Sequence, residues 1–101
     1  MPRPKALDGS EIEARLQALD GWTLESGKLH REFRFANFVE AFGFMTQIAL
    51  HAEKLDHHPE WSNVYDRVKV DLTTHDAKGI TELDFELASR MDAAARTATK
   101  R

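Results

Sequence analysis

Three segments of the chain carry apolar residues at the three- and four-residue steps of an amphipathic helix. The first covers about residues 11–19, the longest covers about residues 38–55, and the third follows Thr81. Ser10 and Asn37 are predicted to cap the first two helices, because their side-chain oxygens can accept a hydrogen bond from a free backbone N–H. The apolar stripes that predict the three helices are Ile12, Leu16 and Leu19; Phe38, Phe42, Met45, Ile48, Ala49 and Ala52; and Leu83, Leu87, Met91 and Ala94 or Ala95.

Between these helices apolar and polar residues alternate, which is the period of a strand with one buried face. The alternation predicts one pair of strands over residues 22–24 and 29–35. A second pair consists of a short strand around Val64 and a longer one over residues 68–74. The element order is then α-β-β-α-β-β-α. It favours an α+β fold with a four-stranded antiparallel sheet and helices packed on one face.

The ends of the elements follow from local signals. Pro59 disfavours helical geometry at the residue before it, so the central helix is predicted to end near Asp56 or His57. Thr81 is expected to cap the last helix, with Asp84 three residues later in a near capping box.

The length of 101 residues predicts one domain, which we place at residues 8–96. Residues 1–7 are expected to be a flexible lead-in, because two prolines and two basic residues offer little to bury. Residues 97–101 are expected to fray as the C-terminus of the last helix.

Composition excludes several classes of function. The net charge of −3 argues against nucleic-acid binding by bulk electrostatics. No segment approaches the roughly 20 apolar residues of a membrane span, and the N-terminus lacks the apolar run of a secretory signal. The chain has no cysteine, so disulfides, thiolate zinc sites and a thiol nucleophile are excluded. We expect a cytoplasmic protein that has neither nucleic acid nor a membrane as a partner.

Residues 53–61 form the densest group of side chains capable of chemistry. His57 and His58 lie at the predicted helix end, and an imidazole exchanges protons near pH 7, so the pair is a candidate acid–base site. The alternative is an exposed histidine pair at a helix end. Glu53 precedes His57 by four residues on the same helical face and is a candidate to orient that imidazole. Asp56 is the corresponding candidate for His58. The alternatives are a simple surface i,i+4 pair for Glu53 and a solvated acid for Asp56.

Three further residues extend this candidate site. His75 follows a strand expected to neighbour the helix end, Trp61 has a ring that can stack on a flat heteroaromatic ligand, and Asp84 can accept hydrogen bonds from a ligand. Each has a structural alternative: a loop histidine, a core tryptophan and a helix-capping aspartate. A metal site that includes His51 is disfavoured, because zinc-ligand spacings are absent.

The spacing of these residues resembles the signature of the pterin-4a-carbinolamine dehydratase family. The matching residues are Glu53-x-x-x-His57-His58-Pro59, Trp61-x-Asn63-Val64-Tyr65, Thr74-His75, Gly79-Ile80-Thr81 and Asp84. The resemblance extends over about residues 8–96, and the family's element order agrees with the order predicted above.

The resemblance implies a hydro-lyase that dehydrates 4a-hydroxytetrahydrobiopterin, or a related pterin carbinolamine, to quinonoid dihydropterin. No metal and no organic cofactor is implied. His57 and His75 are implied as the proton-transfer groups, and His58 as a binding residue with a supporting catalytic role. The substrate-binding residues that it implies are Glu53, Asp56, Trp61 and Asp84.

The resemblance also implies partners. Family members form homodimers or homotetramers, and their pterin substrate is a by-product of aromatic amino-acid hydroxylases. A rival interpretation from another class is a non-catalytic binding or regulatory module of the same fold. A small metal-binding protein is a third.

Overall fold

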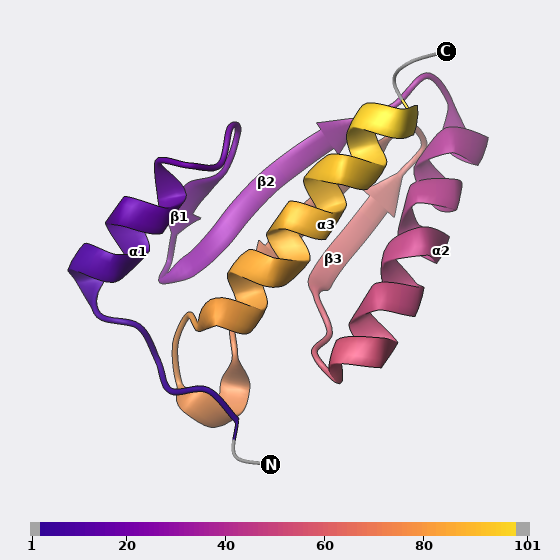
Figure 1. The fold of residues 1–101 in the computed structure, drawn as a ribbon. Helices are drawn as coiled ribbons and strands as arrows, with labels where there is room; N and C mark the ends of the chain where they lie inside the picture. The colour runs from indigo at the N-terminus through magenta and orange to yellow at the C-terminus, as the bar shows by residue number, and fades with distance from the viewer. Residues whose placement is uncertain (1–2, 99–101) are drawn as a thin grey trace.

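The computed structural model describes residues 3–98, and its elements follow the predicted order (Figure 1). The predicted α-β-β-α-β-β-α arrangement is confirmed, with one additional 3₁₀ turn before the last helix. The elements are α1 (Gly9–Leu16), β1 (Thr23–Glu25), β2 (Lys28–Arg34), α2 (Phe38–Leu55), β3 (Glu60–Val64), β4 (Arg67–Leu72), η1 (His75–Ala77) and α3 (Glu82–Ala98).

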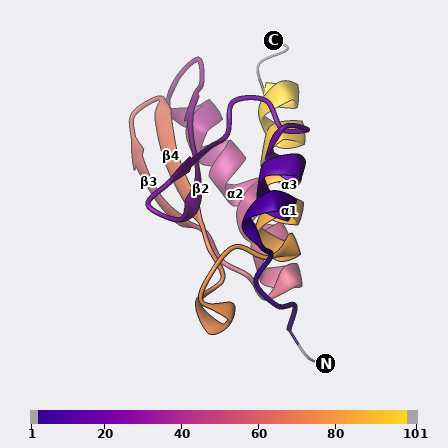
Figure 2. The same ribbon diagram turned by 90° about the vertical axis from the view of Figure 1, so that its left-hand side faces the viewer.

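The four strands form one antiparallel sheet in the order β1-β2-β4-β3. All three helices lie on one side of it, as expected (Figure 2). The register places Leu29 opposite Leu72 and Phe33 opposite Val68, so these apolar side chains share the face that the helices cover. The alternate residues of the strands point the other way. We call that side the open face, and its residues include His30, Glu32, Glu60, Ser62, Lys69 and Asp71.

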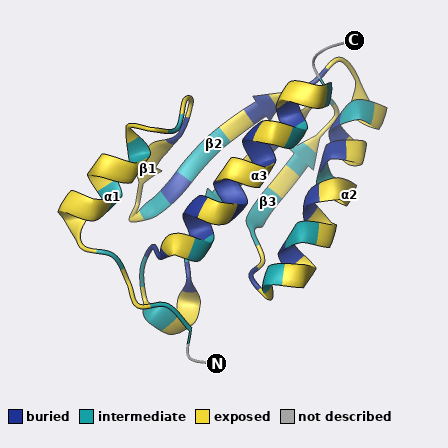
Figure 3. Cartoon of the chain, viewed as in Figure 1, coloured by how far each residue is buried: buried dark blue, intermediate teal, exposed yellow. Residues whose placement is uncertain are grey.

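The core lies between the helix-covered face of the sheet and the inner sides of α2 and α3, which Figure 3 shows as buried. Leu29, Ile48, Leu72 and Leu87 are among its completely buried side chains. By contrast, α1 has no buried residue and lies beside the β1 edge of the sheet. Burial of α2 and α3 is therefore what fixes the ends of these helices relative to the strands.

The first helix begins earlier than predicted. Asp8, not Ser10, is its N-cap: the Asp8 carboxylate accepts from the backbone N–H of Glu11 at 2.9 Å, and Glu11 completes a capping box. A carboxylate at this position also interacts favourably with the positive end of the helix dipole, which favours Asp8 over a neutral hydroxyl. The Ser10 hydroxyl instead donates to Asp8. The helix ends at Leu16, three residues before the predicted end.

The central helix has the predicted cap and end. Asn37 caps it through the backbone N–H of Glu40, and Asp56 ends it in the left-handed conformation, with φ of 52°. The predicted buried stripe is partly wrong, because Phe38 and Phe42 are exposed and lie side by side. The side chains of α2 that are buried are Ala41, Phe44, Ile48 and Ala52.

A buried carboxylate attaches α3 to the sheet and to the loop before β1. Asp92 accepts from the indole Nε1 of Trp22 at 2.8 Å and from the Arg31 guanidinium at 2.9 Å. Burial raises the pKa of the Asp92 carboxyl, and these two donors act in the opposite direction. Gly21 passes over the guanidinium with φ of +86°, and a Cβ there would lie 2.9 Å from Arg31 Cζ. Glycine is therefore favoured at position 21 for two reasons: the backbone has a positive φ, and a larger side chain would collide with the Arg31 guanidinium.

Both ends of the described chain make ordered contacts or belong to a helix. The backbone N–H of Leu7 donates to Ile80 at 2.8 Å, and Leu7 is partly buried against the core. At the other end α3 continues to Ala98. The remaining parts of the predicted lead-in and frayed terminus, residues 1–2 and 99–101, lie outside the described residues.

A core truncation should test this packing. Leu87→Ala removes a completely buried side chain from α3, and we expect the free energy of unfolding to fall by about 2–5 kcal/mol. Leu24→Ala, at a half-exposed position of β1, should change it by no more than about 1 kcal/mol. Urea unfolding followed by circular dichroism measures both. Equal losses in the two variants would contradict the core described here.

Candidate functional site

Three of the predicted histidines, His57, His58 and His75, line one pocket. His57 follows the left-handed residue Asp56 at the end of α2, and its backbone N–H still donates to Ala52 at 3.0 Å. His75 begins the 3₁₀ turn after β4. Both line a small pocket of about 150 Å³, whose lining residues are Arg3, Asp56, His57, His58, Thr73, His75 and Asp76. The pocket thus joins the end of α2 to the loop between β4 and α3.

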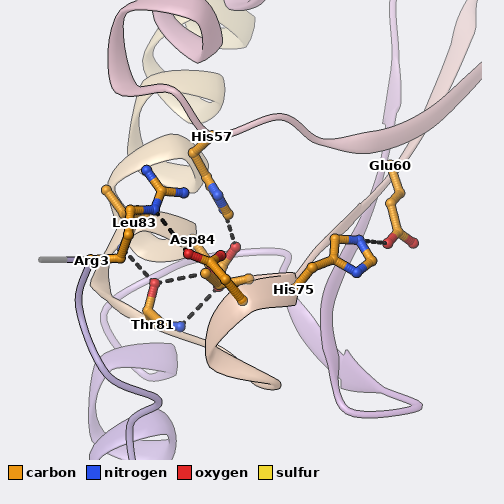
Figure 4. Close-up of polar contacts among 9 residues, drawn as sticks. Arg3, His57, Glu60, His75, Thr81, Leu83 and Asp84 are labelled. Carbon is orange, nitrogen blue, oxygen red and sulfur yellow. Dashed lines mark hydrogen bonds and ion pairs between the residues drawn. The ribbon is translucent and has the colours of Figure 1, made fainter.

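The imidazole of His57 is buried against Asp84. Its Nε2 lies 2.5 Å from Asp84 Oδ1, and both side chains are almost completely buried (Figure 4). A carboxylate only accepts hydrogen bonds, so Nε2 is the nitrogen that donates. The other ring nitrogen, Nδ1, is left for a different partner. The contact orders the ring and its tautomer together.

The second oxygen of Asp84 has donors of its own. Oδ2 accepts from the Thr74 hydroxyl at 2.8 Å and from the backbone N–H of Thr81 at 2.9 Å. Since the Thr74 proton is used in this way, the Thr81 hydroxyl must be the donor in its 2.8 Å contact with Thr74. The backbone N–H of Leu83 in turn donates to that Thr81 hydroxyl. The predicted cap of α3 by Thr81 and Asp84 is therefore present, and the capping carboxylate is the one that holds His57.

His75 has an exposed ring with a different carboxylate. Its Nε2 lies 3.1 Å from Glu60 Oε2, and the side chain is 82% exposed. The Glu60 carboxylate also accepts from Lys28 Nζ at 2.6 Å. This hydrogen bond holds the pKa of Glu60 below its ordinary value and that of Lys28 above its own. Neither residue was assigned a role from the sequence, although Glu60 belongs to the 53–61 stretch and strand alternation places both residues on the open face.

Glu53 contacts a different histidine from the one its spacing suggested. Its carboxylate lies 3.1 Å from Nε2 of His58, and both side chains are exposed. Residues four apart lie side by side only within a helix, and α2 ends at Leu55, before His57. Asp56 then turns the chain, so His57 points inward and His58 outward.

Trp61 was predicted to belong to the site and does not line the pocket, whereas Arg3 was not predicted and does. Trp61 is on the helix-covered face of β3, opposite Val70, and is partly buried against the core rather than lining the pocket. Arg3 of the lead-in does line the pocket, where its Nε lies 3.3 Å from Asp76 Oδ2. Only the tertiary fold brings Arg3 there, and no motif in the sequence marks it.

A larger cavity of about 490 Å³ lies beside β2 and α3, against Arg31 and Asp92. These two side chains are already bonded to one another, and the cavity has no histidine among its lining residues. The smaller pocket is therefore the better candidate for acid–base chemistry, because imidazole exchanges protons near neutral pH.

Within residues 3–98, no three histidine, aspartate or glutamate side chains are grouped so that they could hold a metal ion. Over the same residues, the structure contains no helix whose length and hydropathy would let it cross a bilayer.

Comparison with known proteins gives matches along almost the whole chain. The family model described as "Pterin 4 alpha carbinolamine dehydratase" matches residues 5–94. Two bacterial relatives carry the name "Putative pterin-4-alpha-carbinolamine dehydratase". The one from Solibacter usitatus is 58% identical over 88% of this chain and 94% of its own. The one from Chelativorans sp. is 61% identical over 92% of this chain and 96% of its own.

Solved structures agree with this. The crystal structure of a "transcriptional coactivator/pterin dehydratase" from Brucella melitensis has a TM-score of 0.87 and 53% identity, covering 90% of this chain and 99% of that one. A pterin dehydratase-like protein described as a RuBisCO assembly factor of the alpha-carboxysome has a TM-score of 0.61. It is 21% identical over 73% of this chain and 86% of its own, so it shows the shared fold alone.

The hydrogen bonds around Asp84 predict a stability effect. Asp84→Asn keeps the size of the side chain but removes its charge and turns one acceptor into a donor. The amide can then pair with His57 only if the ring gives up its Nε2 proton, and the charge that strengthens all three hydrogen bonds is lost, so we expect the free energy of unfolding to fall by about 1–3 kcal/mol. Asp76→Asn, which removes only the exposed contact with Arg3, should cost no more than about 1 kcal/mol. Urea unfolding at neutral pH compares them, and an Asp84→Asn protein as stable as wild type would contradict the network.

Proposed function

The chain belongs to the pterin-4a-carbinolamine dehydratase family, and on that premise we propose that it dehydrates a 4a-hydroxytetrahydropterin to the quinonoid dihydropterin. One observation carries the proposal. Two imidazoles from separate elements line the same small pocket, and each is bonded through Nε2 to its own carboxylate. Such a pair suits a reaction in which one group gives a proton and another takes one.

The reaction balances with acid–base chemistry alone. The C4a–O bond breaks, the hydroxyl takes a proton and leaves as water, N5 loses its proton, and a C4a=N5 double bond forms. One proton is supplied and one is removed, and no electrons pass to an external acceptor. Two positioned acid–base groups are therefore sufficient, each with a usual effect of roughly 10²–10⁴-fold.

We assign the proton transfers to His57 and His75. Asp84 and Glu60 accept from their Nε2 atoms, which leaves Nδ1 of each ring for the substrate. His57 is held by a buried contact, so its position is the better defined of the two. We propose His58 as a binding residue, since it lines the same pocket on its exposed side.

The acidic residues have separate proposed roles. The Glu53 and Asp56 carboxylates, near the end of α2, suit the donor edge of a pterin ring, with Glu53 also orienting His58. Asp84 acts through His57 and through the turn that carries His75. Packing of Trp61 against the core supports a structural contribution to β3 rather than a direct contact with the ring.

Biopterin is our proposed substrate, and an aromatic amino-acid hydroxylase in the same cytoplasm is its proposed source. The enzyme would then return the hydroxylase's pterin to a form that a reductase can use. No resident metal or organic cofactor takes part in this scheme.

The direct test is dehydration of freshly generated 4a-hydroxytetrahydrobiopterin, followed by absorbance. Wild-type protein should accelerate it, and His57→Ala and His75→Ala should each lower kcat by about 10²–10⁴-fold. His51→Ala is the matched control, because His51 is on α2 outside the pocket, and it should keep full activity. Full activity of His57→Ala would overturn the assignment. Folded wild-type protein without any activity would favour the non-catalytic binding module.

We also propose that the protein forms a homodimer or homotetramer through α2. Phe38, Val39, Phe42 and Leu50 are exposed along this helix, and Leu50 is 71% exposed. Positions 39 and 50 are about three helical turns apart, so these side chains lie toward one side of the helix. Exposed apolar side chains grouped in this way are typical of an interaction surface.

Leu50→Glu should therefore dissociate the oligomer, as measured by light scattering after size-exclusion chromatography. Val64→Glu introduces the same charge at an exposed position at the end of the edge strand β3 and should leave the mass unchanged. Dissociation by Val64→Glu alone would place the interface at the sheet edge instead. A monomeric wild type would overturn the oligomer proposal.

A further inference from the structure

We propose that Glu60 and Lys28 are positioning residues for His75, which hold its ring with Nε2 protonated so that Nδ1 is the nitrogen exchanging a proton with the substrate. The role of this proton transfer in catalysis rests on the proposed function. The arrangement of the three side chains is independent of that function, and the tautomer of His75 can be measured without following the reaction.

The positions of the three residues on the sheet support this inference. Glu60 begins β3 and Lys28 begins β2, while β4 lies between these strands. In the register, His30 and Glu60 both pair with Asp71 of β4, so Lys28 and Glu60 share the open face. Their 2.6 Å contact therefore reaches across β4. It places the Glu60 carboxylate next to the 3₁₀ turn that begins with His75 (Figure 4).

His75 needs such a partner more than His57 does. The ring of His57 is enclosed and ordered by Asp84, but the ring of His75 is almost fully exposed, and its contact with Glu60 is the single polar contact recorded for it within the described residues. An exposed side chain without a fixed contact samples several rotamers. Glu60 is therefore the group that limits the orientation of this imidazole.

Lys28 keeps the Glu60 carboxyl ionised, so that Glu60 can only accept hydrogen bonds. Its hydrogen bond is the largest influence holding the pKa of Glu60 below the ordinary value, so the carboxylate is ionised at neutral pH. An ionised carboxylate cannot donate, and the proton between Glu60 and His75 must therefore belong to Nε2. Two further contacts lie close by: Asp71 lies 2.8 Å from His30 on the open face and also helps to raise the pKa of Lys28, and Arg3 pairs with Asp76 beside the turn.

The contact between Glu60 and His75 is accessible to solvent, so its contribution to the stability of the fold is small. Ion pairs of this kind contribute little to stability, and we expect Glu60→Gln to leave folding almost unchanged. Glutamine is close in shape but has both a donor and an acceptor end, so it no longer specifies which ring nitrogen carries the proton. The loss should appear in the tautomer and in kcat rather than in unfolding.

Two-bond ¹H–¹⁵N correlation spectra at about pH 8.5, where a free imidazole is neutral, report the tautomer directly. In the wild type, His75 should show a protonated Nε2 and an unprotonated Nδ1. In Glu60→Gln the two nitrogen shifts should move toward one another, and Lys28→Met should cause the same change to a smaller extent. Glu32→Gln and Lys69→Met are matched controls on the open face and should leave the spectrum of His75 as in wild type.

Kinetics give the second readout. Glu60→Gln should lower kcat for 4a-hydroxytetrahydrobiopterin roughly fivefold with a smaller change in KM, while Glu32→Gln keeps the wild-type kcat. A wild-type Nδ1-protonated tautomer, or a His75 spectrum that Glu60→Gln does not change, would overturn the positioning role even if the dehydratase activity is present. An inactive wild type with the expected spectra would overturn the proposed function and leave the positioning role standing.

Discussion

A carboxylate buried inside a protein is tolerated only where hydrogen-bond donors replace its water, because the uncompensated loss of hydration is on the order of several kcal/mol. Asp84 is such a group. Its donors come from the end of α2 through His57, from the end of β4 through Thr74, and from the start of α3 through Thr81. No two of these segments are continuous in the chain, so satisfying one carboxylate fixes three element ends relative to one another. The pocket is formed where these ends meet.

The two histidine–carboxylate contacts at the pocket differ in kind. Asp84 is neutralised by dipoles only, apart from His57 itself, and is shielded from solvent. Glu60 is matched by the formal charge of Lys28 and remains accessible to water. Charge–charge effects are stronger where water is excluded, so His57 experiences its carboxylate more strongly than His75 does. The two imidazoles thereby have unequal environments, although each contacts a carboxylate.

Much of this architecture follows from the sequence because its signals are local. Asn37 and Thr81 act as caps as predicted, Asp56 lies at the predicted end of α2, and strand alternation identifies the buried sides of β2 and β4. Periodicity was less decisive on α2, where two overlapping apolar stripes fit the same helix. The predicted buried stripe contains Phe38 and Phe42, which are exposed, whereas the stripe that is buried in the structure contains Phe44.

The contacts that were missed depend on long-range geometry. Glu60 meets Lys28 only because β4 inserts between their strands, and Arg3 reaches the pocket only because the chain before α1 passes the β4–α3 loop. Glu53 illustrates the limit of predicting contacts from helical spacing. Because the left-handed residue Asp56 follows the helix, the Glu53 carboxylate contacts His58 and not His57.

That left-handed residue has a consequence for how the sequence can vary. Asp56 converts two neighbouring histidines into one inward and one outward side chain, and which is which depends on where α2 stops. Each helical residue turns the chain by about 100°. An insertion or deletion of one residue within α2 would therefore have to displace either the core face of the helix or the inward histidine. The length of α2 is thus constrained by the pocket as well as by the core.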